Sequence, residues 1–303
     1  MSPENAQRLK SLEKVLAQEI RGQDHALPRI AAALKRGELG LSKPSRPRSS
    51  FLLLGPTGVG KTETVVVATR HLFGDGHLFR FDMSEFQTQE SLGLLLGARL
   101  GEHGYLGMAL ARASEGSILF DEVEKAHPRV LDLLLQLLDG ARVTVATGAT
   151  LDFSGFHIWL TSNLGAADLL EVRHSSDATL ERHVMAKAQQ AFRPEIFARL
   201  SERLVFRRLG FSIQLEIAGK MLAQELEFLR TKGIPVSAAT EVLGFLVEKG
   251  FHPRLGARPM RDAVERYVGD AVAEWLMDGH QGAGILRVDA MQDRLRVEVG
   301  EPG

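Results

Sequence analysis

The chain has 303 residues, of which 44% are hydrophobic and 25% charged, the ordinary balance of a globular protein and not of a disordered or collagen-like one. Its 37 basic and 38 acidic residues give a net charge of −1, which favours neither nucleic acid nor an anionic membrane as a partner. It has no cysteine, so disulfides, thiolate metal sites and cysteine nucleophiles are excluded. Its longest apolar runs are far too short to cross a bilayer, and the polar N-terminus does not resemble a secretory signal. These features predict a cytoplasmic protein.

The first fifty residues are predicted to form two helices and a loop. Ser2 and Pro3 are typical of a helix start, and leucines recur at helical spacing from Leu9 to Leu16. A second helix is expected over about 24–36. The proline- and serine-rich stretch 42–49 predicts a connecting loop.

Four short apolar runs follow, separated by stretches of helical periodicity such as 130–138. Each run is typical of a fully buried strand in a parallel sheet. The runs are 51–54, 78–81, 117–120 and 157–160. Strands that alternate with helices predict a parallel α/β sheet.

Beyond about residue 208 the pattern changes to helical periodicity over 212–230, 237–249 and 257–277. The two apolar stretches 284–288 and 295–299 predict a small hairpin. The change in pattern places a domain boundary near 205–211.

A phosphate-loop pattern, G-x-x-x-x-G-K-[ST], is matched in full after a predicted buried strand and before a predicted helix. Its glycines allow the tight turn in which successive N–H groups point at a phosphate, and the helix N-terminus adds a positive dipole end. Lys61 is placed to reach the β- and γ-phosphates of a nucleotide, and Thr62 to bind Mg²⁺. The predicted nucleotide site is formed by Gly55, Pro56, Thr57, Gly58, Val59, Gly60, Lys61 and Thr62.

Polar side chains follow two of the other predicted strands. Asp121 and Glu122 end the strand that begins at residue 117, and because side chains alternate along a strand they are expected to point in different directions. Asp121 suits the hydration shell of Mg²⁺, and Glu122 suits the deprotonation of a water that attacks the γ-phosphate. Asn163 either hydrogen-bonds the γ-phosphate or that water, or simply caps a turn, and spacing alone does not decide. The carboxyl ends of parallel strands open at one edge, so these groups are expected to converge there.

Phosphoryl transfer develops negative charge that a guanidinium can stabilise with two hydrogen bonds. Arg193 and Arg199 lie near the end of the first domain, and Arg258 lies at a helix start in the second. Composition does not choose among them.

Together these motifs make the chain resemble the Clp-type AAA+ ATPases, most closely the second ATPase module of the ClpB-like disaggregases. The matching segments cover nearly the whole chain in the family's order: 46–63, 81–85, 119–128, 161–165, 192–195 and 256–259. The resemblance implies a large AAA+ nucleotide-binding domain with a parallel sheet over 1–207. A smaller, mostly helical domain with a short hairpin would follow over 208–303.

The resemblance also implies roles for the predicted site residues. Lys61 and Thr62 correspond to the Walker A motif, and Asp121 and Glu122 to the Walker B motif. Asn163 corresponds to the first sensor of bound nucleotide. These roles make the chain an ATPase that uses Mg²⁺.

Other implied roles concern the rim of the site and the subunit interface. Arg199 stands where the family has its arginine finger, which acts on the nucleotide of the neighbouring subunit, and Arg258 where it has its second sensor. Ile20 and Arg21 occupy the adenine-side segment, in which the family usually has two aliphatic residues, so Arg21 is a departure. A trans arginine requires assembly for hydrolysis, and the family's usual ring is a hexamer.

The family grips a polypeptide with an aromatic pore loop, and the corresponding segment 97–107 is several residues shorter here. Tyr105 is the candidate substrate contact, although its position matches a downstream packing tyrosine better. The primary function expected is a protein-remodelling, unfolding motor; the alternative is a nucleotide-controlled assembly or regulatory module that does not thread polypeptide. Nothing between residues 165 and 182 resembles the tripeptide by which such motors bind a peptidase, so no peptidase partner is predicted.

Overall fold

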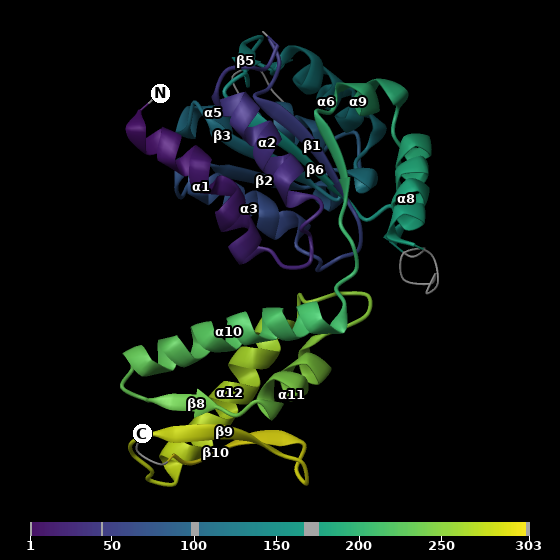
Figure 1. The fold of residues 1–303 in the computed structure, drawn as a ribbon. Coiled ribbons are helices and arrows are strands. Elements are labelled where there is room, and N and C mark those ends of the chain that lie inside the picture. The colour runs from purple at the N-terminus through teal and green to yellow at the C-terminus, as the bar shows by residue number, and fades with distance from the viewer. Residues whose placement is uncertain (1, 44, 98–102, 167–175, 301–303) are drawn as a thin grey trace. The chain divides into compact units, whose positions relative to one another are not determined.

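The computed structural model describes residues 2–43, 45–97, 103–166 and 176–300. The chain divides into two compact units, one of Met1–Pro56 with Gly60–Arg207 and the other of Thr57–Val59 with Arg208–Gly303 (Figure 1).

The N-terminal unit is built on a five-stranded sheet in the order β2-β3-β6-β1-β7, with every neighbouring pair parallel. Its strands are β1 (Ser49–Leu54), β2 (Leu78–Asp82), β3 (Gly116–Asp121), β6 (Phe156–Ser162) and β7 (Glu202–Val205). Every residue of β1, β3 and β6 is buried, as expected of strands covered on both faces. The parallel sheet predicted from the four apolar runs is therefore confirmed.

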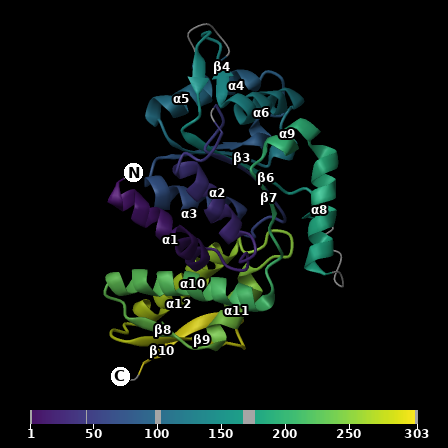
Figure 2. The ribbon, with the colours of Figure 1, turned by 45° about the horizontal axis from the view of Figure 1, so that its top comes forward.

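Helices cover both faces of this sheet. Figures 1 and 2 show α1 (Pro3–Glu19), α2 (Leu27–Glu38) and α3 (Lys61–Phe73) grouped on one side. On that side Phe51 stacks on Trp159, whose indole N–H donates to Ser117 Oγ at 3.1 Å. Alternate residues such as Leu52 and Phe120 face the other way, into one apolar cluster with the helices after β3. These helices are α6 (Pro128–Gly140), α8 (Asp177–Ala191) and α9 (Pro194–Arg199).

The remaining elements within the described residues of this unit are short. They are two 3₁₀ turns, η1 (Met83–Glu85) and η2 (Val123–Lys125), two helices, α4 (Leu92–Leu96) and α5 (Gly104–Arg112), and one hairpin, β4 (Arg142–Thr144) with β5 (Thr150–Asp152). The hairpin and the edge strand β7 were not among the predicted elements. Both are short and half polar, so the sequence gives them no apolar run.

The C-terminal unit combines three helices with a three-stranded sheet. The helices are α10 (Phe211–Thr231), α11 (Glu241–Gly250) and α12 (Met260–Met277). The predicted hairpin is present as β9 (Gly284–Asp289) with β10 (Arg294–Val299). The start of the predicted helix 237–249 is wrong, because β8 (Val236–Ala238) pairs in parallel with β9 and the helix begins only at Glu241.

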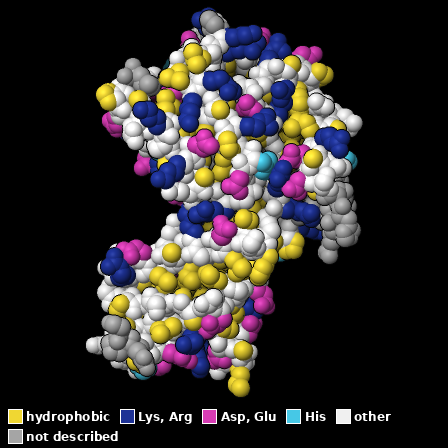
Figure 3. Space-filling model, in the orientation of Figure 1, with side chains coloured by type: hydrophobic (Ala, Val, Ile, Leu, Met, Phe, Trp, Pro, Cys, Tyr) yellow, Lys and Arg dark blue, Asp and Glu magenta, His cyan; other side chains and the backbone are white. Residues whose placement is uncertain are grey.

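Acidic and basic side chains are interspersed over the surface seen in Figure 3, as the net charge near zero suggests. None of the helices within the described ranges combines the length and the apolar character that a bilayer-spanning segment needs.

Candidate active site

The phosphate-loop segment joins the end of β1 at Leu54 to the start of α3 at Lys61. Gly55, Gly58 and Gly60 have φ angles of 136°, 73° and 102°, which side-chain-bearing residues rarely adopt. A Cβ atom at Gly55 would also lie 2.5 Å from the carbonyl oxygen of Phe206. The loop conformation therefore depends on glycine, and it is of the kind in which backbone N–H groups gather around an anion.

Lys61, the first residue of α3, is buried with its ammonium group turned onto the loop. Its Nζ donates to the carbonyl oxygens of Gly55 at 2.6 Å and Pro56 at 2.7 Å, and to Asn163 Oδ1 at 2.9 Å. The lysine thus links the loop after β1 with the polar residue after β6.

Asp121, at the end of β3, is buried and has a partner on each carboxylate oxygen. Thr161 Oγ1 donates to Oδ1, and Thr62 Oγ1 donates to Oδ2 at 3.4 Å. The guanidinium of Arg80 on β2 lies 2.6 Å from the same Oδ2. A hydroxyl and a carboxylate oxygen this close are hard donors of the kind that Mg²⁺ takes, so Thr62 and Asp121 fit such an ion.

Glu122 lies just beyond β3 and has a left-handed backbone, with a φ of 57° and a ψ of 49°. Its N–H donates to Thr161 Oγ1 at 3.1 Å, which helps to hold this strained turn. Asp121 and Glu122 were predicted to point in different directions because side chains alternate along a strand. That reason is wrong, because Glu122 lies beyond the strand. A turn, and not the pleat of the strand, directs the two carboxylates apart.

The Glu122 carboxylate is held by two neighbours. Asn163 Nδ2 donates to its Oε1 at 3.0 Å, and Lys125 in η2 forms an ion pair with its Oε2. The hydrogen bond to Glu122 raises the pKa of Lys125 above its ordinary value. Asn163 is fixed in turn by its own N–H, which donates to Glu124 Oε1 at 2.9 Å.

Lys61, Asn163 and Glu122 thus form one chain of hydrogen bonds along the carboxyl-end edge of the sheet. Residues on three strand ends that are far apart in the sequence meet there, as the parallel topology requires. The sequence reading missed Arg80, Lys125 and Thr161, which pair with the two acids. The sequence gives one hint of the role of Arg80, which is that a basic residue stands inside the otherwise apolar run 78–81.

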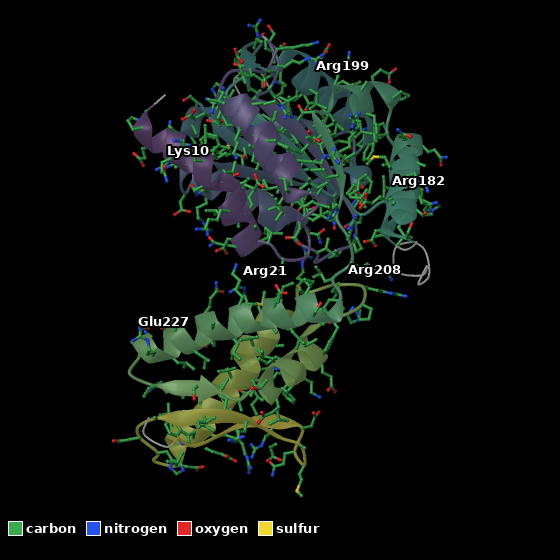
Figure 4. The ribbon with its side chains drawn as sticks, viewed as in Figure 1. Lys10, Arg21, Arg182, Arg199, Arg208 and Glu227 are labelled. Atoms are coloured by element: carbon green, nitrogen blue, oxygen red, sulfur yellow. The ribbon has the colours of Figure 1, made fainter. Side chains whose placement is uncertain are left out.

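The residues predicted for the adenine side follow the end of α1. Ile20 is buried, and a Cβ atom at Gly60 would lie 3.4 Å from its Cγ2, so this side chain adjoins the phosphate loop. Gln23 is fully buried and forms two hydrogen bonds with the backbone of Arg207. Its Oε1 accepts from the Arg207 N–H at 2.9 Å, and its Nε2 donates to the Arg207 carbonyl oxygen at 3.0 Å. Arg21, between them, is half-buried and is labelled in Figure 4.

Arg199 lies at the opposite edge of the sheet from the phosphate loop. Its carbonyl oxygen accepts from Ser50 Oγ at 3.2 Å, and Ser50 is near the start of β1 whereas the loop follows its end. Five residues of strand separate the two by roughly 16 Å, which one arginine side chain with its three-methylene stem does not bridge. Arg199 therefore does not reach the phosphate loop of its own chain.

The other two predicted contacts are Arg258 and Tyr105. Arg258 is exposed in the C-terminal unit, just before α12. Tyr105 is 42% exposed in the first turn of α5, with its ring stacked on Phe81 and edge-on to Phe86. Residues 98–102 of the segment predicted to be shortened lie outside the described residues, as do residues 167–175, where no peptidase-binding tripeptide was predicted.

Comparisons with known proteins show what the chain is similar to. A family model described as AAA domain (Cdc48 subfamily) matches residues 46–203, and one described as the C-terminal, D2-small domain of ClpB protein matches residues 209–286. A heat shock protein 100 of Trypanosoma brucei brucei is 39% identical over 285 residues, covering 91% of this chain and 33% of the relative. A chaperone protein ClpB of Rhizobium meliloti (strain 1021) is 38% identical over 301 residues, covering 97% of this chain and 35% of the relative. The chain thus spans about a third of the length of these relatives.

One solved structure extends the likeness to three dimensions. A chain titled "Closed State CryoEM Reconstruction of Hsp104:ATPyS and FITC casein" has a TM-score of 0.85 and 29% sequence identity to this one. The match covers 98% of this chain and 52% of that chain.

Proposed function

Since the chain belongs to the AAA domain family of the Cdc48 subfamily, we propose that it hydrolyses ATP and uses the energy to remodel or unfold polypeptide substrates. The observation that carries the proposal is the hydrogen-bonded row of Lys61, Asn163 and Glu122 beside a glycine-dependent phosphate loop. Residues 1–207 would be the large nucleotide-binding domain and residues 208–303 the small domain. The similarity to chaperones named ClpB and heat shock protein 100 supports a cytoplasmic ATPase of the Clp type.

In this proposal each strand end supplies one function at the phosphates. Lys61 leaves the loop carbonyls to bind the β- and γ-phosphates, which are stronger acceptors because they are charged. Thr62 and Asp121 would hold Mg²⁺, which would neutralise phosphate charge when bound. Arg80 now pairs with Asp121 Oδ2, so this ion pair would compete with the bound ion for the carboxylate.

Glu122 would act as the base that accepts a proton from the attacking water. Asn163 already donates a hydrogen bond to the Glu122 carboxylate. A contact between Asn163 and the γ-phosphate would therefore change the position of that carboxylate. Ile20 and Arg21 would line the adenine side through their backbone, and Arg258 would contact the nucleotide as the second sensor.

The position of Arg199 supports a shared active site. Because it lies across the sheet from its own phosphate loop, it would act on the nucleotide of a neighbouring copy. Such a head-to-tail contact closes into a ring, which we propose to be a hexamer.

This proposal is tested by measuring ATPase activity and molar mass across protein concentration. Specific activity is expected to rise with the mass of the assembly, and a non-hydrolysable ATP analogue is expected to move the midpoint of assembly to lower protein concentration. Light scattering gives the mass and a coupled assay gives the rate. A monomer that hydrolyses ATP at the full rate would overturn the shared site.

A second candidate function is a nucleotide-controlled assembly module that does not thread polypeptide. The packing of Tyr105 against Phe81 and Phe86 favours it, because a ring engaged in packing is less available as a grip. Loss of such a partly exposed aromatic contact costs about 1–2 kcal/mol of folding free energy.

We expect the wild type to unfold a tagged substrate with ATP, and Tyr105→Ala to lower the thermal midpoint while keeping the unfolding rate per ATP. Tyr105→Phe, which keeps the ring, is the matched control and should behave as wild type. If Tyr105→Ala lost unfolding at unchanged stability and ATPase rate, Tyr105 would be the grip instead. An absence of unfolding by the wild type, with intact ATPase, would establish the assembly module.

A further inference from the structure

A carboxylate on a neighbouring helix holds the guanidinium of Arg199. Arg199 is the last residue of α9, and Asp139 is in the last turn of α6. Arg199 Nε lies 2.8 Å from Asp139 Oδ1, and its Nη2 donates to Oδ2 at 3.3 Å. Figure 4 shows Arg199 at this end of α9, near α6. Both carboxylate oxygens therefore face the same side of the guanidinium.

These contacts fix the orientation of the guanidinium without using all of its donors. Nη1 donates to the carbonyl oxygen of Glu195 at 3.1 Å, so all three nitrogens have a neighbour in their own chain. A guanidinium carries five N–H groups, and further N–H groups on Nη1 and Nη2 remain for the two oxygens of a phosphate. The hydrogen bond from Arg199 lowers the pKa of Asp139, so the pair stays charged at neutral pH.

The position of Asp139 does not serve the helix that carries it. A negative charge in the last turn of a helix opposes the negative end of the helix dipole. Asp139 thus weakens α6 slightly, so the stability of α6 does not explain why an acid stands beside Arg199.

The ion pair with Asp139 could either keep Arg199 away from a nucleotide or orient it toward one, and the strength of the pair distinguishes the two. Side-chain exposures are 30% for Arg199 and 53% for Asp139, and ion pairs this exposed are weak and screened by salt. Such a pair does not withhold Arg199 from a triphosphate. Arg46 also lies near this carboxylate, with its Nη2 4.0 Å from Asp139 Oδ1.

We propose that Asp139 is a positioning residue that pre-orients Arg199 for the nucleotide of the neighbouring copy. It restricts the rotamers of a long side chain before the phosphate arrives, and so lowers the entropy lost in the transition state. The inference rests on the proposed trans role of Arg199 and adds to it a residue that touches no nucleotide.

The test is the variant Asp139→Asn, measured on the full chain at concentrations where light scattering shows it assembled. We expect kcat to fall about tenfold with the KM for ATP nearly unchanged, because orientation matters most in the transition state. The thermal midpoint should stay level or rise, since an unfavourable helix charge is removed. The matched control is Asp132→Asn, on the same helix, which removes the ion pair with Arg193 and should leave kcat near wild type.

A double variant separates an action through Arg199 from a merely structural role. In the Arg199→Ala background, Asp139→Asn should change kcat by less than about twofold, because residues that act as a unit are not additive. An equal tenfold loss in that background, or an equal loss in Asp132→Asn, would overturn the inference. If Asp139→Asn kept the wild-type turnover while Arg199→Ala was inactive, the role of Asp139 would be overturned and the trans role of Arg199 would stand. An active Arg199→Ala would overturn the trans role itself.

Discussion

Replacing Glu122 with glutamine is expected to stop ATP turnover and to leave nucleotide binding intact. The change keeps the shape of the side chain and an oxygen to accept from Asn163 Nδ2, but it removes the carboxylate that we propose takes a proton from water. A positioned general base contributes about 10²- to 10⁴-fold to a rate, so kcat should fall by at least about a hundredfold. Steady-state ATPase assays and a fluorescent ATP analogue measure the two properties separately.

A matched control for this experiment is Glu85→Gln, which replaces an exposed carboxylate in η1, just after β2. It removes the same charge from an exposed side chain and should leave kcat near wild type. Glu122 would not be the base if Glu122→Gln kept more than about a tenth of the wild-type rate. A loss of nucleotide binding in Glu122→Gln would instead show that its carboxylate holds Asn163 and Lys61 in place.

The sequence predicted the sheet well because its central strands are buried on both faces. Burial makes them continuous apolar runs, and such runs are visible in the sequence without knowledge of their partners. The strands β7 and β8 lack this signal, since they have four and three residues and form only where a distant strand offers a free edge. Pairing that depends on tertiary contact overrides local propensity there.

The site shows the same division between local pattern and long-range register. Spacing identifies Lys61 and Asp121, because the loop and the strand end are local features. The partners of the site acids come instead from the register of parallel strands. Asp82 lies opposite Asp121, which brings Arg80 of the same strand near the carboxylate, and Phe120 lies opposite Leu160, next to Thr161. No single segment carries that information.

The resemblance to a known family identifies Arg199 as the candidate arginine finger, but it does not predict which residues surround that side chain. Asp139 lies 60 positions earlier in the chain, and only the packing of α9 on α6 brings the two side chains together. An acid at a helix end is common on protein surfaces, so its sequence context gives no reason to single it out.

Mixing two inactive variants is expected to restore ATP hydrolysis if Arg199 acts across a subunit interface. Arg199→Ala keeps an intact phosphate loop but supplies no guanidinium to its neighbour. Lys61→Ala supplies Arg199 but loses the ammonium that now bonds Gly55, Pro56 and Asn163. Each variant alone should have a kcat at least about a thousandfold below wild type, the usual contribution of an arginine finger.

In a random equal mixture, an interface is active only when an Arg199→Ala copy presents its nucleotide to a Lys61→Ala copy. This arrangement occurs at about a quarter of the interfaces of a head-to-tail ring, so the mixture should recover up to about a quarter of the wild-type rate. Recovery should require exchange of subunits, and it should disappear when the copies are diluted below the assembly midpoint.

The mixture also distinguishes the shared site from an arginine that acts on its own chain. If Arg199 served the phosphate loop of its own copy, no pairing of the two variants could contain a complete site, and the mixture would stay inactive. The double variant, which carries both substitutions in one chain, is the control. Mixed with wild type in equal amounts, it should leave only about a quarter of the interfaces complete, because each site needs a wild-type copy on both sides. A rate that instead fell only to half would show that each copy hydrolyses ATP alone.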